Sequence, residues 1–169
     1  MEFCFIGGLA VQRWGEPRET VNVDLTLVTG FGNEERFIQI LLQHFEGRIP
    51  DAAQFARDRR VLLLRSKKGV GLDVALGALP FEELIVQRSS IFDYPPKIKL
   101  RTCSAEDLIV LKAFAGRGQN WVDIERIIIR QTGKLDWDYI RAQLRPLAEL
   151  KSAPEILDQL ERRREEFEQ

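Results

Sequence analysis

Hydrophobic and polar positions alternate with a period of two along two segments in the first half of the chain. The segments are "VNVDLTLV" at 21–28 and "LDVAL" at 72–76, and each carries apolar residues at alternate positions. Successive side chains of a strand point to opposite faces, so the pattern predicts two strands with an apolar face each. Asn22 and Asp24 then share the polar face of the first strand. Short apolar runs predict two further strands, at 3–6 and 60–65.

Helical spacing replaces this alternation in other parts of the chain. Residues 34–45 carry five apolar side chains at that spacing. Further along, Ser104 with Asp107 three residues later is a capping signature, and Gly116 stands where that helix should end. Three more helices are predicted after it, over 121–133, 136–150 and 153–169.

The predicted strands therefore lie in the first part of the chain, and the second part is predicted to be helical. We predict an α+β fold, with a mixed β-sheet lobe and its flanking helices at 1–101 and a helical lobe at 102–169. A chain of 169 residues suffices for one substantial core with a helical extension and is short for two ordinary domains.

Composition narrows the class of protein. The chain is 44% hydrophobic and 30% charged, which is typical of a folded protein, and its net charge of −1 gives no global field to attract nucleic acid. Local basic clusters at 57–60 and 65–68 could touch a polyanion or simply be solvated hairpin ends. No apolar run approaches the roughly 20 residues of a membrane span, and the first residues do not resemble a signal peptide. We expect a cytoplasmic protein that does not enter a membrane.

Three features indicate a ligand site. Gly7-Gly8 separates a strand from a helix, where the backbone can approach a phosphate. Asn22 and Asp24 form the second feature. The third is Asp73, an acid between apolar neighbours, which is more often a paired structural residue when it stands alone. Its occurrence together with Asp24 and the glycine doublet favours a shared functional site. One histidine and two scattered cysteines do not predict a zinc site.

The run "GGLAVQRWGEPRETVNVDLTL…LDVAL" resembles the nucleotidyltransferase superfamily of the DNA polymerase β type. Within it, "GEPRETVNVDLTL" and "LRTCSAEDLIVLKAFAGRGQNWVDIE" are most similar to AbiEii-type toxins of type IV toxin–antitoxin systems. The resemblance covers roughly residues 4–150 and implies a nucleotidyltransferase-like sheet lobe with a helical lobe after it. It also implies Mg²⁺-dependent transfer of a nucleoside monophosphate from an NTP.

The resemblance implies a role for each matching residue. Asn22 and Asp24 match the Asp-x-Asp pair and Asp73 matches the third acid, which together hold two Mg²⁺ ions in an active form. Gly7 and Gly8 would cradle the β- and γ-phosphates.

Four further residues are assigned by the same resemblance. Arg18 and Thr20 would orient the nucleotide. Lys112 would point into the cleft from the helical lobe and contact phosphate, and Asp123 matches a later acid of that lobe. From the residues alone, Lys112 could equally be a solvated helix lysine and Asp123 could lie on the exposed side of its helix.

An amide at position 22 leaves three explanations open. Asparagine can supply one oxygen to a metal ion, but it brings no charge and cannot bridge two ions. The residue could be a deliberate replacement, a mark of decay into a nucleotide-binding pseudoenzyme, or a feature of an enzyme that works with one metal ion.

Several functions therefore stay open at this stage. The resemblance implies an RNA acceptor such as a tRNA 3′ end, and a toxin restrained by a partner antitoxin. A protein hydroxyl is the alternative acceptor. A folded module that binds nucleotide or a partner protein without turnover is the second hypothesis, and an unrelated α+β protein with structural acids is the third. The sequence does not fix the NTP or the oligomeric state.

Overall fold

The computed structural model describes residues 1–168, which form two compact units. The first unit contains Met1–Leu9 and Glu19–Cys103, and the second contains Ala10–Arg18 and the chain from Ser104 onward. Helix α1 (Gly7–Trp14) belongs to both, because the division falls between Leu9 and Ala10. The sequence predicted that all of 1–101 forms one lobe. The contacts within the folded chain instead group Ala10–Arg18 with the later helices.

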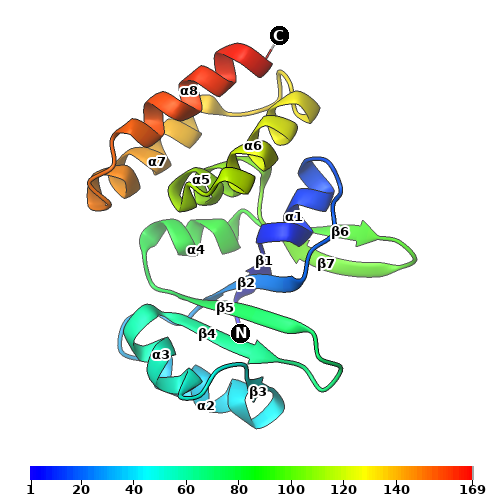
Figure 1. The fold of residues 1–169 in the computed structure, drawn as a ribbon, viewed down its shortest axis with the longest axis vertical. Coiled ribbons are helices and arrows are strands. Elements are labelled where there is room, and N and C mark those ends of the chain that lie inside the picture. The colour runs from blue at the N-terminus through cyan, green and yellow to red at the C-terminus, as the bar shows by residue number, and fades with distance from the viewer. Residues whose placement is uncertain (169) are drawn as a thin grey trace. The chain divides into compact units, whose positions relative to one another are not determined.

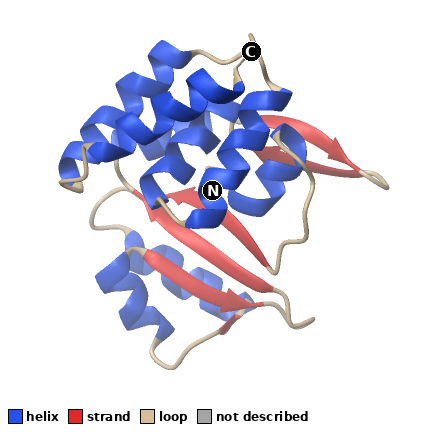
Figure 2. Ribbon diagram, turned by 45° about the horizontal axis from the view of Figure 1, so that its top comes forward, coloured by secondary structure: helices blue, strands red, loops and turns tan. Residues whose placement is uncertain are grey.

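The first unit is built on a seven-stranded mixed sheet (Figures 1 and 2). Its strand order is β3-β4-β5-β2-β1-β7-β6. The pairs β2–β5 and β1–β7 are parallel and the other neighbours are antiparallel. The strands are β1 (Phe3–Phe5), β2 (Asn22–Val28), β3 (Glu46–Gly47), β4 (Val61–Arg65), β5 (Gly71–Gly77), β6 (Ser90–Tyr94) and β7 (Ile98–Thr102).

The core of this unit lies on one face of the sheet, under α2 (Glu34–His44) and α3 (Ala52–Arg59). Buried alternate residues of three strands supply it: Leu27, Leu62, Leu64, Val74 and Leu76. Ile38 of α2 and Ala52 and Ala56 of α3 complete it. Because these strand residues take one face, Asp24 and Asp73 lie on the opposite face. Helix α4 (Pro80–Gln87) packs against β1 and β2, and the Ile85 carbonyl accepts a hydrogen bond from Cys4 Sγ at 3.9 Å.

Four helices make up most of the second unit: α5 (Ala105–Ala115), α6 (Gly118–Arg130), α7 (Trp137–Leu150) and α8 (Glu155–Phe167). Helix α5 packs against the other three, which explains why it is apolar on almost every side. Its predicted ends are confirmed: Ser104 Oγ accepts from the Asp107 amide at 3.1 Å, and Gly116 ends the helix at φ +67°. Asp107 is buried and also accepts from the Tyr139 hydroxyl at 2.6 Å.

The predicted α+β fold is confirmed, with differences in detail. Helix α3 and the short strand β3 were not predicted, and α6 begins three residues before the predicted start at 121. Within residues 1–168 no helix has both the length and the apolar character that a membrane crossing requires.

Candidate functional site

Asp24 and Asp73 stand directly opposite each other on neighbouring strands. In the parallel pair β2–β5, Asn22 is aligned with Gly71 and Asp24 with Asp73. Paired residues of adjacent strands project from the same face, and adjacent strands lie about 4.8 Å apart. Both carboxylates can therefore approach one shared cation, on the face of the sheet away from the α2–α3 core.

The glycine doublet lies against Asp24 and Thr20. Gly7 has φ +56°, and a Cβ atom there would stand 2.1 Å from Asp24 Oδ2. A Cβ at Gly8 would stand 2.3 Å from Thr20 Oγ1, and the Thr20 hydroxyl donates to the Asn22 carbonyl at 2.9 Å. The structure thus brings the start of α1, Thr20 and the β2 acid together. The glycines are needed for this packing, whereas their predicted contact with phosphates stays a prediction.

Asp73 is held by two side chains. Arg48 Nη2 donates to Asp73 Oδ1 at 2.5 Å, and Asn22 Nδ2 donates to Asp73 Oδ2 at 3.4 Å. The Arg48 and Asp73 side chains are 21% and 26% exposed, so this ion pair is only partly screened by water. Sequence reasoning missed Arg48, which follows a two-residue strand and stands in no motif.

Arg18, Lys112 and Asp123 form a separate cluster within the second unit. Arg18 Nε and Nη2 each donate to one Asp123 oxygen at 2.9 Å, and Lys112 Nζ donates to Oδ2 at 2.6 Å. Gln119 Nε2 also donates to Asp123 Oδ1, at 3.1 Å. The Asp123 side chain is fully buried and that of Lys112 is 7% exposed. Lys112 is therefore not a solvated lysine, and Asp123 is not on the exposed side of its helix.

The charge state of this cluster follows from its contacts. Burial alone raises the pKa of Asp123, but hydrogen bonds from Arg18 and Lys112 outweigh burial and lower that pKa from 3.8 to about 2. Asp123 is therefore ionised at neutral pH and holds both cations in place. The contacts of Lys112 and Arg18 thus have a structural explanation, and their predicted roles toward a nucleotide stay predictions.

Two arginines of the basic cluster at 57–60 form ion pairs within the sheet unit. Arg57 Nε pairs with Glu35 at 2.9 Å, and Arg60 pairs with Glu34 and donates to the Leu76 carbonyl at 2.6 Å. These two arginines have intramolecular partners, which weakens the idea that they contact a polyanion.

The donor set at Asp24 and Asp73 fits one divalent cation. Two carboxylates and the Asn22 amide are oxygen ligands of the kind that Mg²⁺ binds. In the described part of the chain, 1–168, no group of three or more His, Cys, Asp or Glu side chains could hold a metal ion. A site with three carboxylates for two ions is therefore not present here, since position 22 is an amide.

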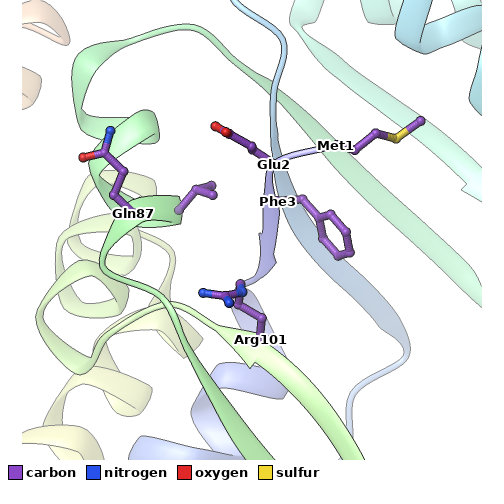
Figure 3. Close-up of a pocket in the computed structure, with 6 residues that line it drawn as sticks. Met1, Glu2, Phe3, Gln87 and Arg101 are labelled. Atoms are coloured by element: carbon purple, nitrogen blue, oxygen red, sulfur yellow. The ribbon is translucent and has the colours of Figure 1, made fainter.

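A pocket of the sheet unit lies among residues other than the two acids and their contacts. It has a volume of about 400 Å³ and is lined by Met1, Glu2, Phe3, Val86, Gln87 and Arg101. Figure 3 shows Gln87 on α4, Glu2 just before β1 and Arg101 on β7 around it. None of these six is a predicted site residue.

Comparisons with known proteins concern the fold. No protein-family model matches the chain, and no curated protein sequence matches it. Among solved structures, the chain is similar to one described as an antigenic nucleotidyltransferase-like protein from Paracoccidioides brasiliensis. The TM-score is 0.48 and the identity 17%, over 91% of this chain and 84% of that chain. A likeness at this level concerns the course of the chain and shows neither a family nor an activity.

Proposed function

We propose that the protein is a nucleotidyltransferase that moves a nucleoside monophosphate from an NTP to an acceptor. The observation that carries the proposal is the alignment of Asp24 with Asp73 on parallel strands, with Gly7 packed against Asp24. Paired carboxylates beside the start of a helix are suited to hold a cation next to a polyphosphate.

The proposed reaction is a displacement at the α-phosphorus of the NTP. An acceptor hydroxyl oxygen forms a bond to that phosphorus, the bond to the bridging oxygen of the β-phosphate breaks, and pyrophosphate leaves. Asp73 takes the hydroxyl proton, and Gly7 and Gly8 donate backbone N–H groups to the leaving phosphates. A bound Mg²⁺ ion supplies the positive charge that offsets the triphosphate and aligns it.

For the acceptor we propose RNA, such as a tRNA 3′ end, in the cytoplasm. This part rests on the sequence resemblance to AbiEii-type toxins, which also suggests a partner antitoxin that restrains the activity. A protein hydroxyl is the alternative acceptor.

A second candidate function is a module that binds nucleotide or a protein partner without turnover. Asn22 favours it because the amide brings no charge to a cation site. The contact of Arg48 with Asp73 favours it too, since a guanidinium already neutralises one of the two acids.

The test is incorporation of labelled NTPs into total tRNA in the presence of Mg²⁺. We expect Asn22→Asp to raise incorporation at least about tenfold, because a charged ligand is restored. Asp73→Ala should abolish it and EDTA should do the same, while Asp58→Ala, an exposed acid on α3, should leave it unchanged.

The outcomes separate the two functions. Label in RNA that requires Asp73 supports the enzyme. Nucleotide binding without transfer, in both the chain with Asn22 and Asn22→Asp, supports the binding module. An Asn22→Asp chain with the same rate as the chain with Asn22 would refute the proposed metal geometry.

A further inference from the structure

We propose that Arg48 is a resident cation of the Asp24–Asp73 site. Its guanidinium takes one of the two cation positions that a three-carboxylate site gives to metal ions, so this site binds one divalent ion. The inference rests on the proposed function, which makes Asp24 and Asp73 metal ligands, and it deepens that function by assigning the second positive charge to the protein itself.

Arg48 lies in the same row of aligned residues across the sheet as the two acids. Asp24 is aligned with Asp73, and Asp73 is aligned with Leu63 of β4. The Arg48 amide donates to the Leu63 carbonyl at 2.9 Å, just after β3 has paired Gly47 with Leu64. Arg48, Leu63, Asp73 and Asp24 therefore follow one another across the sheet. Two strand spacings separate Arg48 from Asp73, about 10 Å, which an arginine and an aspartate side chain can span together.

A glycine leaves room for the arginine. A Cβ atom at Gly71 would stand 2.7 Å from Arg48 Nη1 and 2.4 Å from Asn22 Oδ1. Any side chain at position 71 would therefore displace both groups from Asp73. Strand β5 begins with Gly71, and the Arg48 guanidinium passes over it on the way to Asp73. The glycine therefore leaves the space that the Arg48–Asp73 ion pair needs.

Charge explains why one metal ion is enough. The site contains two carboxylates and one amide, and a guanidinium stays protonated throughout the physiological pH range. Arg48 pairs with Asp73, so the protein itself supplies one of the positive charges of the site. A second divalent ion at Asp73 would lie next to a fixed positive charge, and the repulsion between them opposes its binding.

The arrangement also gives Asn22 a role. Its Nδ2 donates to the Asp73 oxygen that Arg48 does not take. A carboxylate at position 22 would face Asp73 at that short distance and would need a cation between them. The amide and the arginine therefore act together, since each donates a hydrogen bond to a different oxygen of the same acid.

The experiment measures how many Mn²⁺ ions the full chain binds, and how tightly. Mn²⁺ is titrated into the protein while free ion is followed by electron paramagnetic resonance, with thermal unfolding as a second readout. The variants are Arg48→Gln, which removes the charge, and Arg48→Lys, which keeps it. Arg59→Gln, at an exposed arginine of α3, is the matched control for loss of one positive charge.

We expect the natural chain, Arg48→Lys and Arg59→Gln to bind one ion each. Arg48→Gln should bind the first ion at least about tenfold more tightly or gain a second ion, because a nearby positive charge is gone. One ion with equal affinity in the natural chain and Arg48→Gln would overturn the role of Arg48 and leave the proposed function standing.

The remaining outcomes separate the two proposals further. Binding by Arg48→Gln alone would support Arg48 as the resident cation and would count against a metal-dependent natural chain. Absence of binding in every variant would overturn both proposals. Circular dichroism spectra that match the natural chain show that each variant has folded.

Discussion

The substitution Asp123→Asn tests whether the buried cluster of the helical unit is structural. It keeps the shape of the side chain and removes the charge that faces Lys112 and Arg18. Lys112 Nζ lies 2.6 Å from Asp123 Oδ2 and its side chain is 7% exposed, so water cannot readily replace the carboxylate. Arg18 is 30% exposed and can be hydrated more easily.

The expected cost follows from this difference in burial. Breaking a buried ion pair by removing one partner costs about 3–5 kcal/mol, because a charge is left in the interior without its counter-ion. We expect the lower part of this range, about 3 kcal/mol at neutral pH, since Arg18 is partly hydrated. The double variant Asp123→Asn with Lys112→Met should recover much of that loss, because it removes the stranded ammonium as well.

Urea unfolding as a function of pH supplies the assay. The pKa of Asp123 is lowered from 3.8 to about 2, so its stabilising effect is present above about pH 4 and is lost as pH falls toward 2. The free-energy difference between the natural chain and Asp123→Asn should shrink by about 1 kcal/mol at about pH 3 and by about 2 kcal/mol on full protonation. A difference that does not change between neutral and acidic pH would refute the ionised, doubly paired state.

Two further predictions concern single contacts. Gly7→Ala should lower the free energy of unfolding by at least about 2 kcal/mol, because Gly7 has φ +56° and the new Cβ would collide with Asp24. Gly32→Ala should lower it by only about 1 kcal/mol, because Gly32 has φ +85° but open space around it. Equal costs in thermal or urea unfolding would contradict the close approach at Gly7. Tyr139→Phe should cost about 1–3 kcal/mol in the same assay, because it removes the hydroxyl that donates to buried Asp107, and an unchanged midpoint would show that this bond contributes little.

The elements with strong periodic patterns could be predicted from the sequence. The alternation at 21–28 and 72–76 gave two strands whose Leu27, Val74 and Leu76 lie in the core, although Val21 precedes β2 and is 90% exposed. Ser104 with Gly116 bounded α5 correctly. Helix α3 was missed for a physical reason. The residues that it packs against the core are the small Ala52, Ala53 and Ala56, and the rest of it is polar or exposed, so it has no strong apolar stripe to detect.

The site could be predicted only as a set of residue types. Each strand pattern shows which face an acid takes, but the alignment of Asp24 with Asp73 depends on two strands that are distant in sequence becoming parallel neighbours. Arg48 was missed because its reach to Asp73 depends on the order β3-β4-β5-β2, which no local pattern encodes. The pairing of Lys112 with Asp123 joins two helices, and helix packing decides it.

The parallel pairing of β2 with β5 has a consequence during synthesis. Asp24 leaves the ribosome early, yet the strand that aligns Asp73 beside it ends at Gly77. Every intervening segment, including α2, β3, α3 and β4, must be made before the two acids can meet. A nascent chain that ends before Gly77 therefore lacks the strand pairing that aligns the two acids, and the site proposed here cannot yet form in it.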